Sequence, residues 1–380
     1  MNDICEIKHK AAASQARDII ATFKEAEDLI NIGAYEKGSN IKIDKSIKYI
    51  DKVNNYLKQG VDEKSSFEDN INNLKNILSK NINIYLLGSC GPNFFEYCNN
   101  VPNIFSKNLA NISNLIHNKN INLFFEEIIN YSVNNPYIKC IFNQDKFTDI
   151  SISYFWGFLS HYILDRSMHP YIFYLQLNLK NQYKLKSNTS LHKSIETHID
   201  SLLLYKLRNS IPKDFIKNIN INLSNSEMLI LCDMYNFLLK SVFNKSVSYN
   251  DINKSLSTFK QTQIRLIYSN SIYSKLYLFI KNLLCKTGYI ENKIYSKHTH
   301  CINDLLNEKK SPWIDPFSKE EHNESLINIY YDSEHLYQEI VNIFYQYIHN
   351  NKKMVDILNK IENKSYITNQ DFSTQYNINL

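Results

Sequence analysis

The chain has 380 residues and is 43% hydrophobic, which is enough to bury one large core or two smaller ones. Its 43 basic and 38 acidic residues are spread along the sequence, so no block of lysine and arginine marks a nucleic-acid-binding surface. Only seven glycines and seven prolines are present, which leaves little material for hairpins and favours long helices.

Signals for secretion or disulfide formation are sparse. Residues 1–30 contain no apolar run long enough for a signal-peptide core, and nowhere do about 18 consecutive apolar residues form a transmembrane segment. The seven cysteines form no C-x-x-C pair, which argues against a disulfide framework or a cysteine zinc knuckle. We therefore expect a soluble, cytoplasmic protein with reduced thiols.

Apolar residues recur at helical spacing along most of the chain, without sustained strand alternation. The sequence therefore predicts an all-α fold, a multi-helix bundle with a helical C-terminal extension. We expect one helical domain over 1–224 and a second helical region over 225–380 packed on it. Loops are predicted at 35–45, 178–190 and 306–322, and helices at 10–33, 44–58, 67–79, 105–117, 121–133, 148–176, 190–208, 226–244, 250–286 and 325–349.

The densest glycine and proline cluster lies in "YLLGSCGPNFFEYC" (85–98), where Gly88, Gly91 and Pro92 interrupt a helical pattern. Such a turn either positions a side chain or merely ends a helix. Asn93 follows the proline directly, and His117 comes 24 positions later in "LIHNKNINLFFEEI". Alone, neither residue indicates a function.

The segment "GFLSHYILDRSMHPYIFY" (157–174) places His161, Asp165 and His169 at four-residue steps, on one face of a helix. The surrounding residues are apolar, so a water-exposed face fits poorly, and buried imidazoles and carboxylates need partners. This motif alone leaves a metal ion and a satisfied core network open. The nearby aromatic residues could either pack in the core or line an apolar cleft, and the sequence does not distinguish the two. They are Tyr154, Phe155, Trp156, Tyr162, Tyr171 and Phe173.

A second helical segment, "LHKSIETHID" (191–200), adds His192 and Glu196, again four residues apart. The two segments together offer five nitrogen and oxygen donors of the kind that suits zinc, which favours metal binding over a core network. His198 lies two positions after Glu196 and therefore points elsewhere on the helix, as a surface residue would.

The order of these motifs resembles the zinc-dependent phospholipase C family in its compact bacterial form. The resemblance rests on G-x-x-G-P, a downstream histidine, H-x-x-x-D-x-x-x-H-P-Y and H-K-x-x-E, and it covers most of the chain. The segment 301–341, "CINDLLNEKKSPWIDPFSKEEHNESLINIYYDSEHLYQEIV", also looks like the closing loop and final helix of that family.

The resemblance implies one to three bound Zn²⁺ ions and assigns ligands position by position. A first zinc is implied at Asn93, His117, His161 and Asp165. A second is implied at His169, His192 and Glu196. A third, where present in the family, uses an N-terminal histidine, the mature N-terminal amine and the shared aspartate, which here means His9 and Asp165. Asp165 and Asn93 stand at the positions expected to take part in catalysis.

This sequence departs from the family pattern at Asn93, where the family has an aspartate. An amide is neutral, is a poorer ligand and cannot act as a base. The secreted enzymes also expose a processed amino terminus, which we do not expect here, and His9 lies between lysines.

The resemblance implies a hydrolase in which zinc-activated water attacks a phospholipid or another phosphodiester. Two alternatives remain open. Asn93 favours a non-catalytic metal-binding scaffold, and nuclease relatives with a similar zinc cluster suggest a single-strand nuclease. The lack of a basic groove signature argues against the nuclease.

Overall fold

The structure is a computed structural model that describes residues 73–97, 109–134, 144–183, 188–210, 221–267, 304–349 and 351–371. Several predictions lie outside these ranges, namely the helices at 10–33 and 44–58, the loop at 35–45, the second half of the helix at 250–286, and His9.

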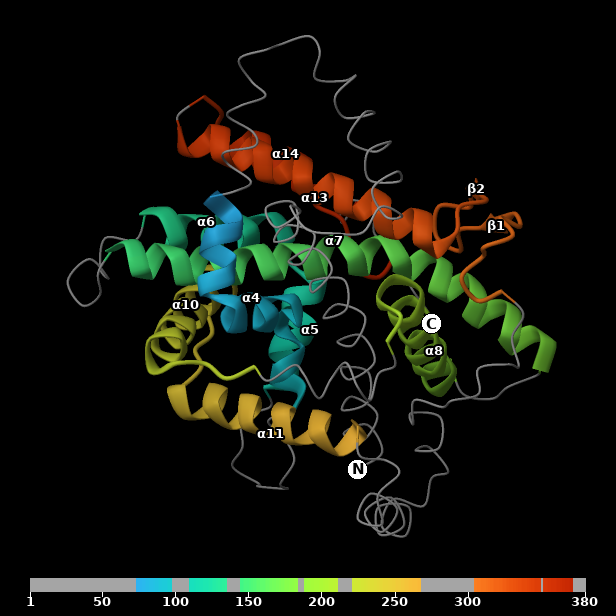
Figure 1. Ribbon diagram of the computed structural model, residues 1–380, viewed down its shortest axis with the longest axis horizontal. Coiled ribbons are helices and arrows are strands. Elements are labelled where there is room, and N and C mark those ends of the chain that lie inside the picture. The colour runs from blue at the N-terminus through green and yellow to red at the C-terminus, as the bar shows by residue number, and fades with distance from the viewer. Residues whose placement is uncertain are drawn as a thin grey trace, which may run out of the picture.

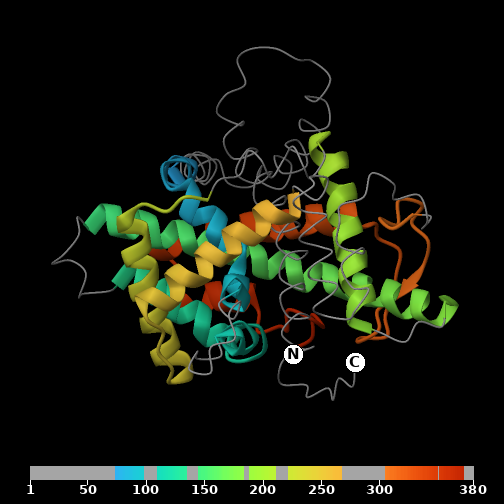
Figure 2. The ribbon, with the colours of Figure 1, turned by 90° about the horizontal axis from the view of Figure 1, so that it is seen from below.

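One long helix, α7 (Gln144–Tyr183), runs through the middle of the molecule, and most other described helices pack on it (Figure 1). Helices α4 (Ile82–Ser89) and α6 (Ile121–Asn134) contact its N-terminal part. Helix α8 (Asn188–Arg208) crosses near its other end, as the view from below shows (Figure 2). Because α7 carries His161, Asp165 and His169, the helices packed on α7 determine which side chains lie next to these three residues.

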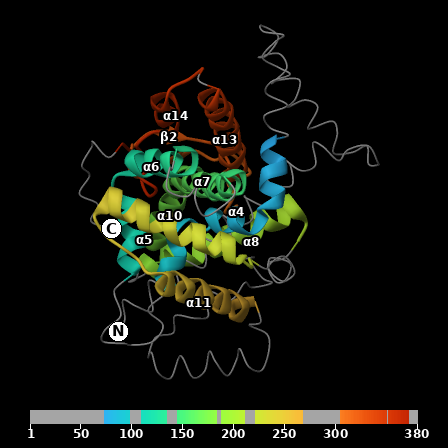
Figure 3. The ribbon, with the colours of Figure 1, turned by 90° about the vertical axis from the view of Figure 1, so that its left-hand side faces the viewer.

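Two further layers enclose α7. Helices α13 (Leu326–Ile348) and α14 (Met354–Ile361) lie on one side, and α11 (Tyr249–Ile267) lies on the opposite side (Figure 3). Helix α10 (Asn225–Phe243) packs on both α6 and α7, and α11 packs on the Gly-Pro turn. The turn itself is a 3-10 helix, η1 (Gly91–Tyr97), which contacts α5 (Ala110–Asn118).

Capping residues explain where two helices begin. The Ser224 hydroxyl accepts the backbone N–H of Glu227, whose carboxylate accepts the backbone N–H of Ser224 in return. Ser325 and Asn328 form the same reciprocal box at the start of α13. Such boxes satisfy backbone donors that the first helical turn would otherwise leave unpaired.

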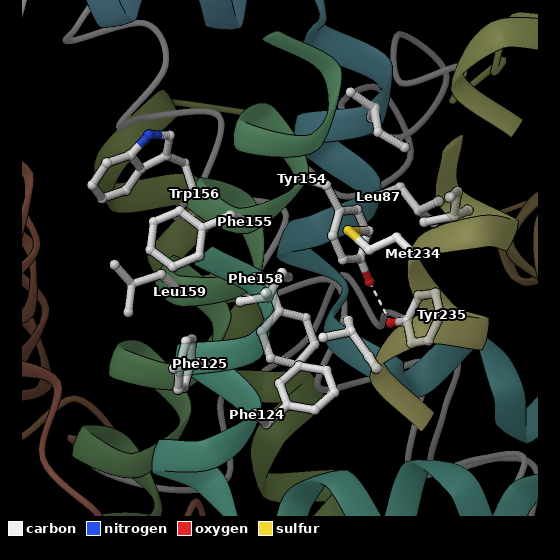
Figure 4. Packing of buried hydrophobic residues seen from close by; sticks show 14 of the residues in the cluster. Leu87, Phe124, Phe125, Tyr154, Phe155, Trp156, Phe158, Leu159, Met234 and Tyr235 are labelled. Carbon is white, nitrogen blue, oxygen red and sulfur yellow. Dashed lines mark hydrogen bonds between the residues drawn. The ribbon is translucent and has the colours of Figure 1, made fainter. Parts of the chain in front are cut away.

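The aromatic residues around the first half of α7 form the core. Tyr154, Phe155, Trp156 and Phe158 are fully buried. Phe158 packs against Phe124 and Phe125, and Tyr154 packs against Tyr235 (Figure 4). A hydrogen bond joins the hydroxyls of Tyr154 and Tyr235 within this layer. These side chains are therefore core packing and do not line a cleft.

Two glycines let α4 and α7 touch backbone to backbone. A Cβ atom on Gly157 would lie 2.1 Å from the carbonyl oxygen of Tyr85, and one on Gly88 would lie 2.4 Å from that of Tyr154. Real Cβ atoms are not found so close to backbone, so only glycine fits at either position. This contact fixes α4, and with it the Gly-Pro turn that follows, directly against α7.

The predicted all-α fold is confirmed, and the sheet in the described residues is one pair of two-residue strands, β1 (Trp313–Ile314) and β2 (Glu321–His322). The predicted loop at 178–190 is wrong at both ends, because α7 continues to Tyr183 and α8 begins at Asn188. That segment has neither glycine nor proline, so its sequence contains no residue that ends a helix. No helix in the part of the chain that the structure describes is long and apolar enough to span a membrane.

Candidate metal centre

The stripe of polar residues on α7 is buried. His161 is fully buried, Asp165 is 4% exposed and His169 is 8% exposed. Four-residue steps keep the three side chains on one face of the helix, as their spacing predicts. Helices α5 and α8 bring further imidazole and carboxylate groups to this face.

His117, His161 and Asp165 form one cluster of possible ligands, called group one here. Each residue offers a donor atom, and these atoms all lie within 4.8 Å of one another. The Nε2 atoms of His117 and His161 face each other at 3.2 Å. Burial, followed by the neighbouring His161, lowers the pKa of His117 to about 3, so its imidazole is neutral and able to bind a metal at physiological pH.

The Gly-Pro turn is shaped to fit over His161. Gly91 has a φ of +56°, and a Cβ atom there would lie 2.3 Å from Cδ2 of the His161 ring. Glycine is the residue that adopts this backbone conformation at no steric cost and leaves space for the ring. The turn therefore positions a side chain as well as ending α4.

Asn93 reaches group one through a serine. Its side chain is 4% exposed, and its Oδ1 accepts a hydrogen bond from the Ser113 hydroxyl at 3.5 Å. The same hydroxyl lies 3.4 Å from Nδ1 of His117. Sequence reasoning missed Ser113, although its position four residues before His117 places it on the same face of α5.

His169, His192 and Glu196 form the second cluster, called group two here. Oε1 of Glu196 lies 3.2 Å from Nε2 of His192 and 3.5 Å from Nε2 of His169. The two imidazole rings stack nearly parallel, with centroids 5.5 Å apart. The H-x-x-x-E motif of α8 thus faces the last histidine of the α7 stripe.

The two groups adjoin each other along α7. Oδ2 of Asp165, in group one, lies 3.5 Å from Nδ1 of His169, in group two. Every described residue proposed from the sequence as a metal ligand lies in or beside one of the two groups, in the predicted combination, with Asn93 linked through Ser113. Their role as ligands stays a prediction.

Two partners of the group two histidines were not predicted. Oε1 of Gln176 lies 2.7 Å from Nδ1 of His192, and the carbonyl oxygen of Tyr366 lies 2.8 Å from Nδ1 of His169. Each contact directs the Nε2 atom of its histidine toward Glu196. Gln176 comes seven residues after His169, so helical spacing could have found it. Tyr366 lies about 200 residues away from His169, and no local pattern marks it.

Gln176→Ala is expected to weaken zinc binding at group two by about 10–100-fold, the usual effect of removing an outer partner of a ligating histidine. Competition with a chelator of known affinity would measure the change. Gln338→Ala removes the same side chain from α13, a helix that supplies no residue to either group, and should leave zinc affinity unchanged. Equal affinities in the two variants would contradict the role given to Gln176.

The donor set fits zinc. Each group presents two imidazoles and one carboxylate, which is the pattern of three protein ligands found in catalytic zinc sites with an open fourth position. The donors are nitrogen and oxygen, without thiolate, and they are mostly buried, so uncompensated charge there would be unfavourable. A dication held by each group would compensate the carboxylates.

Two family models match the sequence. Residues 53–242, half of the chain, match the family described as zinc dependent phospholipase C. Residues 5–76 match the T3SS EscN ATPase C-terminal domain, a similarity that sequence reasoning missed. The predicted domain boundary near 224 is not tested by these matches.

Curated relatives match a short part of the chain. The flagellum-specific ATP synthase of Bacillus subtilis is 41% identical over 71 residues, which are 19% of this chain and 16% of that protein. The type 3 secretion system ATPase of Sinorhizobium fredii is 35% identical over 71 residues, again 19% and 16%. The chain thus spans about a sixth of the length of these relatives.

No glycine in the sequence is followed by lysine, so the G-x-x-x-x-G-K-[ST] phosphate-binding loop is absent from it. No solved structure matches the chain.

Proposed function

The chain belongs to the zinc dependent phospholipase C family through residues 53–242, and we propose on this basis that it is a zinc-dependent phosphodiester hydrolase acting on a phospholipid or a related phosphodiester. The observation that carries the proposal is the convergence of six ligand-type side chains from α5, α7 and α8 into two adjoining groups. The proposal includes two zinc ions, one in each group.

Each part of the site has a defined task in this proposal. His117, His161 and Asp165 hold the first ion, and group two holds the second. Zinc bound there would supply a Lewis acid for the phosphate oxygens and lower the pKa of a water toward neutrality. Ser113, Gln176 and the Tyr366 carbonyl keep the histidine rings in position.

An apolar wall beside group two supports a lipid substrate. The ring of Phe173 lies 4.6 Å from that of His192, and Phe317 packs edge-on against Phe173 at 5.3 Å. Phe317 comes from the loop between β1 and β2 and is partly exposed. We propose that these two rings contact the apolar part of the substrate next to the phosphate.

The test is hydrolysis of a short-chain phosphatidylcholine by zinc-loaded protein and by protein treated with a chelator. Zinc-dependent release of phosphocholine would support the proposal. Single-stranded DNA, assayed in parallel, distinguishes a nuclease. If the zinc-loaded protein cleaves neither substrate, the hydrolase proposal is rejected and the non-catalytic metal-binding scaffold is favoured.

Asn93→Asp is expected to tighten zinc binding at group one, because it adds an anionic group that is linked to His117 through the Ser113 hydroxyl, without changing the size of the side chain. If Asn93 also takes the place of a general base, hydrolysis should rise by about 10²–10⁴-fold in the variant. Ser113→Ala tests the same link from its other end and should weaken binding at group one. An unchanged zinc affinity in both variants would remove Asn93 from the site.

A further inference from the structure

The segment that follows α14, residues 362–371, crosses α7 beside the two metal groups, and we call it the C-terminal strap. Tyr366 is 1% exposed, Thr368 is 3% exposed and Ser365 is 8% exposed. Its backbone closes on itself, with the N–H of Ser365 donating to the carbonyl of Gln370. A loop that is buried to this extent needs partners for its backbone polar groups.

Tyr366 contacts both groups at once. Its carbonyl oxygen lies 2.8 Å from Nδ1 of His169, in group two. Its ring lies edge-on to His117, with centroids 4.7 Å apart, and 5.7 Å from His161, both in group one. A single residue of the strap therefore touches three of the six side chains that make up the two groups.

The strap is fastened to α7 by residues that alternate with the candidate ligands. The Tyr162 hydroxyl lies 2.8 and 2.9 Å from the carbonyl oxygens of Glu362 and Lys364, to one of which it donates, and it accepts the Lys364 N–H at 3.1 Å. Arg166 pairs with the Glu362 carboxylate at 2.9 Å. Tyr162 directly follows His161, and Arg166 directly follows Asp165.

We propose that the C-terminal strap is a positioning element of the metal centre, so that seating of the strap and binding of zinc favour each other. The carbonyl of Tyr366 accepts the Nδ1–H of His169, which leaves the Nε2 lone pair directed at the ion in group two. The ring of Tyr366 restricts the rotation of His117. This inference rests on the zinc sites of the proposed function but not on hydrolysis.

Tyr162→Phe tests the proposal, since it keeps the buried ring and removes the hydroxyl that holds the strap. We expect zinc affinity to fall by about 10–100-fold and the visible spectrum of Co²⁺ bound in place of zinc to change, because a ligand has lost its orientation. Hydrogen exchange of the strap amides should quicken in the variant, and zinc should slow that exchange in the wild-type protein, since linkage is reciprocal.

Tyr154→Phe is the matched control. This substitution also removes a buried hydroxyl from α7, but at a position two helical turns before Tyr162. The Tyr154 hydroxyl is hydrogen-bonded to the Tyr235 hydroxyl and not to the strap. This variant should keep the zinc affinity, the Co²⁺ spectrum and the slow strap exchange of the wild type.

A second strap variant, Arg166→Gln, breaks the ion pair with Glu362. It should show the same loss of zinc affinity, the same change of the Co²⁺ spectrum and the same faster strap exchange as Tyr162→Phe.

Two results would overturn the coupling alone: tight zinc binding that leaves strap exchange unchanged in the wild type, or wild-type zinc affinity in both strap variants. Absence of zinc uptake by the wild-type protein would overturn the proposed function and the coupling together. A protein that binds zinc, seats its strap on binding and hydrolyses nothing would leave the coupling supported and the hydrolase rejected.

Discussion

His192→Ala is expected to release zinc from group two and to abolish phosphodiester hydrolysis. The Nε2 atom of His192 lies 3.2 Å from Oε1 of Glu196, so alanine leaves that group with one imidazole and one carboxylate. Losing a direct ligand should weaken binding by more than the roughly 100-fold seen for an outer partner. At a zinc concentration near 1,000 times the wild-type Kd, the variant should also lose much of the ~4 kcal/mol by which bound ligand stabilises the folded protein.

His198→Ala provides the control on the same helix. His198 belongs to neither metal group, although it lies only two residues from Glu196. Zinc content, the melting temperature with and without chelator, and phosphatidylcholine hydrolysis would be measured for both variants. Zinc loss in His198→Ala, or full zinc retention in His192→Ala, would show that group two is not a metal site.

Gly157→Ala is expected to destabilise the folded protein by about 3 kcal/mol or more, at the upper end of what overpacking causes. The new methyl group would meet two backbone atoms of α4, at 2.1 Å from the Tyr85 carbonyl oxygen and 2.8 Å from the Ser89 nitrogen. Backbone atoms cannot rotate away as a side chain can, so α4 would have to move off α7. Chemical denaturation of the metal-free protein measures the change without a contribution from zinc.

Ser153→Ala is the comparison for this substitution. Ser153 is equally buried, lies one turn before Gly157 on α7 and donates a hydrogen bond to the Asp149 carbonyl. Its loss should lower the free energy of unfolding by only about 1 kcal/mol. A similar small loss in Gly157→Ala would mean that the two helices do not need the close contact.

The sequence was sufficient for those parts of the site that lie within single helices. Four-residue steps brought His161, Asp165 and His169 onto one face, and the same spacing joined His192 to Glu196. The combination of these motifs with His117 came from the family resemblance, because the pairing of separate helices depends on packing that no local pattern encodes. For the same reason the contact between Tyr366 and His169 was not predicted.

The fold was predicted well where helices are long and have one apolar face, as in α6 and α13. The bounds of α4 were not predicted, because its residues Ile84–Ser89 are all buried, so its apolar residues surround the helix and show no stripe. Helix α14 was missed because eight residues offer too few repeats to distinguish a helix from a loop. Tertiary packing, which is absent from the local sequence, stabilises both.

Because α7 supplies residues to both groups, the rise of a single helix sets how far apart they lie. The eight residues from His161 to His169 span about 12 Å along the axis. Inserting or deleting one residue between Asp165 and His169 would turn His169 by about 100° about that axis and away from α8. This segment of α7 cannot change in length without separating the two groups, and its length is therefore as restricted as the identity of the residues that it carries.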